Sequence, residues 1–287
     1  MKVYADEILG ARERINIKRH CLQAGFLYYA NVLVSISFFL PFRLFSGIRY
    51  IFSRKTRAMQ HVRVGEDFEA AGDLKNALAS FTQALAVCPR LPRAQMSIGR
   101  CFFKKLLFDK AREKIEIFLK SDPENSEANF YLGAIAYYRK NIPEALAYLE
   151  KTEQLLVKER KKMLSVQGNI IMADCYQQVG RHQEAINCIQ RSFRINPKGN
   201  EKVFTIMGKA YKGLRKYAEA LTAFQKALGL RADNFEVWNE VGQVLLILND
   251  KVKALQCFKQ SLSFDSGFEP AKKNILITES MLRAEGR

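Results

Sequence analysis

Small and large apolar positions recur along the chain in blocks of about 34 residues. A small residue marks each of six blocks: Gly65, Gly99, Gly133, Ala173, Gly208 and Gly242. Twelve residues after each of them stands an alanine: Ala77, Ala111, Ala145, Ala185, Ala220 and Ala254. A period of this length is typical of solenoids, in which each block is one supersecondary unit that buries its apolar face only by stacking on its neighbours.

Two further positions follow the same period. Sixteen residues after the small residue comes a large apolar side chain: Phe81, Ile115, Leu149, Ile189, Phe224 and Phe258. Proline closes three blocks, at Pro89, Pro123 and Pro197. We interpret the small residues as the crossing of two helices, the large ones as the filling between units, and the prolines as helix stops, since proline cannot continue a helix.

These positions resemble the tetratricopeptide repeat (TPR) pattern G-x2-Y, A-x3-F and P over 34 residues. Segments 180–197 and 217–230 match it most closely, and the resemblance covers roughly residues 58–268. It implies an all-α fold: an α-solenoid of about six helix-turn-helix units in a right-handed superhelix, followed by a capping helix. We expect the units at 58–91, 92–125, 126–165, 166–200, 201–234 and 235–267, and the capping helix at 268–287.

The third block departs from the period. Gly133 and Ala173 are 40 residues apart, Val157 stands where a closing proline is expected, and the charged run KERKK occupies residues 158–162. The pattern predicts either a lengthened second helix or a loop at this place, together with a change in the direction of the superhelix.

A basic segment, residues 1–57, precedes the repeats. Within it, residues 21–42 are uncharged, which is long enough for a helix to cross a bilayer core of about 30 Å. Three interpretations stay open: a transmembrane anchor, a membrane-inserted hairpin or interfacial helix that includes residues 42–52, and helices buried against the first repeat. Residues 43–57 carry a charge of +5 and residues 1–20 a net +2, so an anchor would leave the repeats facing the cytoplasm.

The net charge of +17 is unevenly distributed. Residues 1–57 contribute +7 of it, and this density favours a membrane over nucleic acid as the partner of the basic surface. The six cysteines show neither a CxxC pair nor a metal-ligand spacing. We expect them to be reduced core residues rather than disulfides, which indicates a reducing compartment.

The sequence contains no recognisable catalytic or metal-binding motif. The three histidines, His20, His61 and His182, are far apart, and no HExxH, P-loop or G-x-S-x-G motif occurs. The lone tryptophan, Trp238, is at the position where the repeat pattern places a packing tryptophan. We therefore predict a protein that is not an enzyme, with no catalytic residue, no cofactor and no metal site.

The family resemblance implies that the first helix of each unit lines a concave groove. Its inward positions give these candidate partner-binding residues: Arg93, Met96, Arg100, Phe103, Phe130, Tyr137, Lys202, Lys209 and Lys212. Neighbouring inward positions hold Glu127, Ala134 and Thr205. Such a groove would suit an extended acidic or amphipathic peptide. The alternative is that these are ordinary solvated positions.

One known subclass of the family grips chaperone C-termini with a clamp of lysine, asparagine and arginine. The corresponding positions are Val62, Glu66, Ser97, Glu127 and Tyr131 in units one to three, so the clamp is absent. We interpret the chain as a non-catalytic scaffold tethered to a membrane through residues 21–52, similar to bacterial TPR proteins that coat an organelle membrane. The alternatives are a soluble adaptor or chaperone-like module and a non-catalytic subunit of an enzyme complex. Self-association is left open, and nucleic acid is not expected as a partner.

Overall fold

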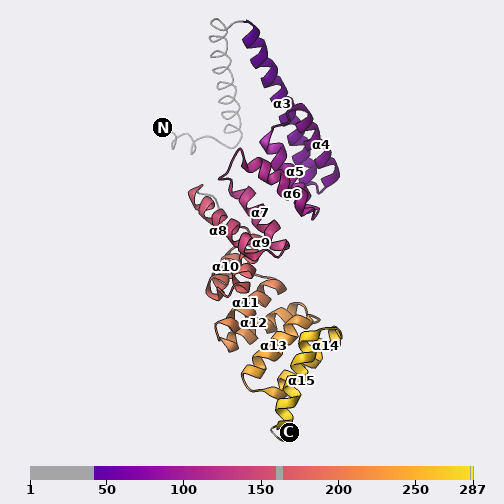
Figure 1. Cartoon of the computed structure of the whole chain (residues 1–287), viewed down its shortest axis with the longest axis vertical. Coiled ribbons are helices and arrows are strands. Elements are labelled where there is room, and N and C mark those ends of the chain that lie inside the picture. The colour runs from indigo at the N-terminus through magenta and orange to yellow at the C-terminus, as the bar shows by residue number, and fades with distance from the viewer. Residues whose placement is uncertain (1–41, 160–163, 285, 287) are drawn as a thin grey trace, which may run out of the picture. The chain divides into compact units, whose positions relative to one another are not determined.

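The computed structural model describes residues 42–159, 164–284 and 286. Every regular element in these ranges is an α-helix, and none is a strand, which confirms the predicted all-α class. The described residues divide into two compact units, with the division between Ala94 and Gln95, and Figure 1 shows the helices of the second unit following one another as antiparallel pairs. Each unit is considered by itself.

The helices have these bounds: α3 (Phe42–Ala70), α4 (Leu74–Val87), α5 (Pro92–Lys104), α6 (Phe108–Leu119), α7 (Ser126–Tyr138), α8 (Ile142–Lys158), α9 (Val166–Gln178), α10 (His182–Ile195), α11 (Glu201–Gly213), α12 (Tyr217–Leu230), α13 (Phe235–Ile247), α14 (Lys251–Phe264) and α15 (Glu269–Ala284). Each repeat supplies a first and a second helix, and α15 is the predicted capping helix. From α5 onward, every first helix is 13 residues long.

In the first unit, α3 packs antiparallel to α4. A Cβ at Gly65 would lie 2.5 Å from Cε1 of Phe81, so only glycine lets the two helices cross this closely. Helix α3 is 29 residues long and is continuous across the boundary expected at residues 57 and 58. The end of the predicted N-terminal segment and the first repeat helix are therefore one helix.

The same crossing recurs in the second unit. Each glycine faces the large apolar residue sixteen positions later, and a Cβ would approach it to 2.6 Å at Gly99, 2.9 Å at Gly133, 2.5 Å at Gly208 and 2.5 Å at Gly242. The fourth repeat combines Ala173 with Ile189 instead, and both are buried. The interpretation of the small residues as helix crossings is confirmed.

Every turn between a first and a second helix has a residue in the left-handed region, seven positions after the small residue: Gly72, Leu106, Lys140, Gly180, Arg215 and Asn249. At the α5–α6 turn, the Leu107 N–H donates to the Phe102 carbonyl at 2.9 Å and the Leu106 N–H donates to the Phe103 carbonyl at 2.9 Å. This pair of bonds is the Schellman motif, which satisfies carbonyls that a helix end leaves free.

Asparagine or serine begins most of the first helices of the second unit. Asn125, Asn200 and Asn234 each accept a bond from the backbone N–H three residues later, and Ser165 does the same for Gly168 at 3.1 Å. These side chains satisfy N–H groups that a helix start cannot bond internally. They fix where each first helix begins and hence which of its residues face the next repeat.

The third repeat differs from the others in its second helix. Helix α8 is 17 residues long, whereas the other second helices have 12 or 14. The lengthened helix is thus one of the two expected forms of the insertion. Residues 160–163, which complete the KERKK run, lie outside the described residues, and so does any loop that they form.

Three of the five cysteines in the described ranges are buried core residues: Cys101, Cys175 and Cys188. All five are free thiols, and burial raises the pKa of Cys175 to about 12. No helix within the described ranges has the length and apolarity needed to cross a membrane. Residues 21–41 of the predicted anchor lie outside these ranges.

Candidate protein-interaction groove

Arg93, the first predicted groove residue, lies near the start of α5. Its guanidinium donates two bonds of 2.9 Å to the Glu66 carboxylate of α3, and its side chain is 56% exposed. Because the pair is open to water, it contributes little to stability. Arg93 is therefore placed on the surface of the first unit with a carboxylate partner of its own.

Met96 and Arg100 also lie on α5, in the second unit. Met96 is 5% exposed and packs in a core cluster with Ala111 and Ile115, so its side chain offers little surface to a partner. Arg100 donates to Glu127 of α7 at 3.1 Å. The sequence placed Arg100 and Glu127 on the same face, and the structure brings them together as an ion pair between successive first helices.

Phe103 belongs to a cluster of aromatic rings rather than to an open groove wall. Its ring lies 5.2 Å from Tyr131, 5.8 Å from Phe108 and 6.0 Å from Tyr138, measured between centroids. Edge-to-face and tilted pairs at such distances stabilise packing beyond the area that they bury. Phe103 is half-buried and joins the end of α5 to α6 and α7.

Tyr137, Asp174 and Lys202 meet across three successive first helices, α7, α9 and α11. The Tyr137 hydroxyl donates to the Asp174 carboxylate, and the Lys202 ammonium donates to the Tyr137 hydroxyl at 2.8 Å. Lys202 lies 3.7 Å from the carboxylate as well. Burial and the bond to Asp174 raise the pKa of Tyr137 above its usual range. The tyrosine therefore stays a neutral donor.

Lys209 and Lys212 of α11 share an acidic partner on α13. The Lys212 ammonium donates to the Glu240 carboxylate and, at 2.8 Å, to the Gln243 side-chain oxygen, while Lys209 lies 4.0 Å from Glu240. The predicted lysine-rich half of the groove is therefore largely neutralised by the protein itself. An acidic ligand would have to compete with Asp174 and Glu240. Asp174 and Lys202, like Lys212 and Glu240, are 28 positions apart in the sequence, and this shared spacing could have predicted both pairs.

A pocket of about 360 Å³ opens beside α7, where the third repeat is irregular. Eight residues line it: Ser126, Glu127, Phe130, Tyr131, Thr152, Leu156, Leu164 and Ser165. Among the candidate partner-binding residues, Phe130 is the one that contributes to this wall. A Cβ at Gly168 would lie 3.1 Å from the Phe130 ring, so glycine lets the start of α9 approach the aromatic wall.

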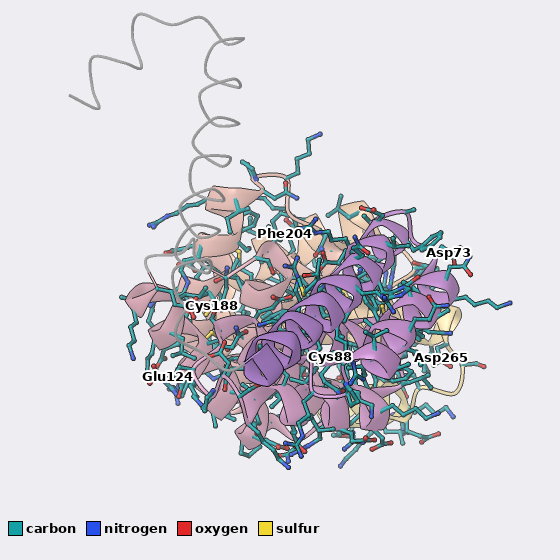
Figure 2. All side chains as sticks on the ribbon, turned by 90° about the horizontal axis from the view of Figure 1, so that it is seen from above. Asp73, Cys88, Glu124, Cys188, Phe204 and Asp265 are labelled. Atoms are coloured by element: carbon teal, nitrogen blue, oxygen red, sulfur yellow. The ribbon has the colours of Figure 1, made fainter. Side chains whose placement is uncertain are left out.

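Acidic and hydroxyl groups surround the pocket. Ser126 donates to the Glu159 carboxylate at 2.8 Å, Glu127 is 49% exposed, and Glu124 is exposed at the surface (Figure 2) and pairs with Lys158. The pocket thus combines an apolar wall with nearby carboxylates, of which Glu127 is paired with Arg100 and Glu124 with Lys158.

Trp238 packs at the start of α13, where its indole N–H donates to the Ala232 carbonyl at 2.8 Å. The packing role expected from the sequence stays a prediction. Across residues 42–159 and 164–284, histidine, cysteine and acidic side chains form no group of three that could hold a metal ion.

Two family models match the chain, and both describe the tetratricopeptide repeat. One model matches residues 106–155 and 207–267, and the other matches residues 166–198. Together the matches cover about half of the chain. The protein is thus a helical-repeat solenoid with the features of an interaction module. It belongs to the tetratricopeptide repeat family.

Known proteins agree with this assignment. "Anaphase-promoting complex subunit 3" of Schizosaccharomyces pombe is 23% identical over 174 residues, which are 60% of this chain and 25% of that protein. The structure of Pseudomonas aeruginosa pilF matches with a TM-score of 0.57 and 17% identity, over 77% of this chain and 97% of the other. That of YrrB, described as a TPR protein with an unusual peptide-binding site, has a TM-score of 0.56 and 14% identity over 67% and 96%.

The chain spans only 25% of the length of the first of these relatives, and the structural likenesses, at such low identity, concern the fold alone. TPR repeats are generally non-catalytic modules that bind other proteins or peptides. The repeats support the same class of role, a non-catalytic protein-interaction scaffold, for this chain.

Proposed function

We propose that the chain recruits partner proteins by binding an amphipathic segment of each partner along the first helices of its second unit. An apolar side chain of that segment enters the pocket beside α7. The observation that carries this proposal is the pocket itself, whose wall is formed by Phe130, Tyr131 and Leu156. Pockets that combine an apolar wall with a few polar groups are the usual anchor sites for a ligand.

The charges of the groove favour an amphipathic segment over a purely acidic one. Lys202 and Lys212 already have Asp174 and Glu240 as partners, so an acidic ligand gains little by replacing them. The rim of the pocket carries the carboxylates of Glu127 and Glu159, which bond to Arg100 and Ser126. A basic residue next to the apolar anchor of the ligand would lie close to both carboxylates. Peptide binding by YrrB, as its description states, supports a peptide as the ligand class.

The test is a selection of peptides from a random display library on the full chain. Peptides obtained in this way should carry an apolar residue near a basic one. Replacing Leu156 with the larger tryptophan fills the pocket, and it should weaken their binding at least tenfold, about 1.4 kcal/mol. Val157→Trp is the matched control, because Val157 is the next residue of α8 and is 80% exposed. Equal affinity for both variants would refute the pocket as the anchor site.

We further propose that residues 21–42 tether this scaffold to a membrane, with the repeats facing the cytoplasm. The uncharged run of 22 residues and the arginines and lysines on both sides of it support this proposal. After carbonate extraction of membranes, a chain with an anchor should stay in the membrane pellet. Its complete release into the supernatant would contradict the anchor and favour the soluble adaptor.

A further inference from the structure

The turn between α5 and α6 presents apolar side chains to solvent. Leu106 is 68% exposed and Leu107 is 42% exposed, and Tyr138, at the end of α7, is 44% exposed. The Tyr138 ring stacks on Phe108, which follows Leu106 and Leu107 at the start of α6, with 5.4 Å between centroids and an angle of 6° between the planes. We call the side chains of Leu106, Leu107 and Tyr138 the turn patch.

Basic side chains surround the turn patch. Lys105, Lys110 and Lys140 are exposed beside it. Within the part of the chain that the structure describes, Lys105 and Lys140 form no ion pair, whereas the neighbouring Arg139 is paired with Asp109. The patch therefore combines projecting apolar groups with ammonium groups that have no carboxylate partner.

The backbone at Leu106 adds an independent observation. Its φ is +59°, a conformation that the equivalent turns give to Gly72 and Gly180 in two repeats and to Lys140, Arg215 and Asn249 in the other three. Left-handed backbone is unfavourable for a side chain with a Cβ and costs glycine nothing. A leucine that is both strained and 68% exposed contributes little to folding.

We infer that the turn patch docks on an anionic lipid surface, with Leu106 and Leu107 entering the interface and the lysines lying at the phosphates. A bilayer accepts protruding apolar groups at any point, and each lysine near an anionic leaflet adds attraction. Tyrosine prefers the level of the headgroups. An acidic protein surface would satisfy Lys105 and Lys140, but it would have to supply a matching cavity for each leucine.

This lipid contact is independent of peptide binding in the groove and is separate from residues 21–42. Its test must therefore report on the turn itself in the full chain. Leu106→Trp places a fluorophore in the patch, and Trp238 is the one native tryptophan and is common to every variant. Leu230→Trp is the matched control, since Leu230 is 58% exposed at the end of α12, away from the turns between first and second helices.

With vesicles of phosphatidylcholine and phosphatidylserine, the emission of the Leu106→Trp chain should shift to shorter wavelength. The shift should be absent with phosphatidylcholine alone and should be lost at high salt. The Leu230→Trp chain should show no shift even if other residues bring it to the vesicle. An unchanged Leu106→Trp spectrum, or equal shifts in both variants, would overturn the inference.

Charge reversal separates a lipid surface from an acidic protein. Adding Lys105→Glu and Lys140→Glu to the Leu106→Trp chain should remove the vesicle-induced shift, with an unchanged far-ultraviolet circular dichroism spectrum. A shift that persists would contradict the role of the lysines. A shift of the same size with soluble polyglutamate in place of vesicles would assign the patch to an acidic polypeptide and overturn the lipid assignment.

Discussion

Two junctions between repeats differ in regularity. The junction of the third and fourth repeats contains the insertion, whereas the junction of the fifth and sixth keeps the regular period. At both junctions successive first helices bond to each other: Lys212 to Glu240 at the regular one, and Tyr137 to Asp174 at the irregular one. At the irregular one, α8 is three residues longer than the second helices of 14 residues, and a pocket of about 360 Å³ lies beside α7. The irregular junction therefore differs by its apolar pocket, and not by a loss of bonds between first helices.

The largest effect is expected where the regular packing is tightest. Gly208→Val would place a Cβ 2.5 Å from the Phe224 ring and should destabilise the folded chain by about 3 kcal/mol, because an overpacked helix crossing must separate. The midpoint of urea denaturation, followed by circular dichroism, measures this.

Gly229 provides the control for glycine replacement. It lies exposed in α12, and a Cβ there would meet nothing within 4 Å. Gly229→Ala should raise stability by up to about 1 kcal/mol, since alanine favours a helix over glycine. If Gly208→Val and Gly229→Ala change the stability of the chain to a similar extent, the close approach of the two helices does not explain why glycine recurs at the repeat period.

A smaller effect is expected from the ion pairs of the groove. Glu240→Gln removes the charge that faces Lys209 and Lys212 and should cost about 1 kcal/mol, because the carboxylate is only 17% exposed. The control is Glu124→Gln, whose partner Lys158 is 66% exposed; it should change stability by less than about 0.5 kcal/mol. Thermal denaturation at low and high salt compares the two, and equal losses would contradict the distinction.

The smallest effect concerns the turns. Arg215→Gly relieves a left-handed residue with a Cβ (φ +59°) and should stabilise the chain by about 0.5 kcal/mol. Gly180→Ala, in the equivalent turn with φ +81°, should destabilise it by about 1 kcal/mol. Urea denaturation of the two variants side by side checks the opposite signs. The same sign for both would mean that the turn conformation does not determine the effect.

The fold could be predicted from the sequence because the side chain must be small wherever the two helices of a repeat cross. Gly208 must be small where Phe224 is large, so the pair recurs at the repeat period and identifies the family. Gly72, Gly180 and Asn249 also carried the signal for left-handed turns. The left-handed turns at Leu106, Lys140 and Arg215 could not be predicted, since these residue types do not favour that conformation.

The candidate site was readable only in part. Position in the repeat placed Phe130 and Lys202 on the first helices, but whether such a side chain is free depends on what the next helix presents. Asp174 and Glu240 neutralise the lysines, and Met96 turns into the core, because helix packing and side-chain conformation decide these contacts. The pocket arises from an insertion whose shape no periodic pattern specifies.

The most direct test of the central claim is site-specific photo-crosslinking in the native host. A photoreactive phenylalanine analogue at Phe130, in the pocket wall, is compared with the same analogue at Val157, which is 80% exposed on α8. We predict discrete crosslinked partner proteins from position 130, reduced when Leu156→Trp is added, and none of them from position 157. The same partners from both positions, or none from position 130, would contradict binding through the pocket.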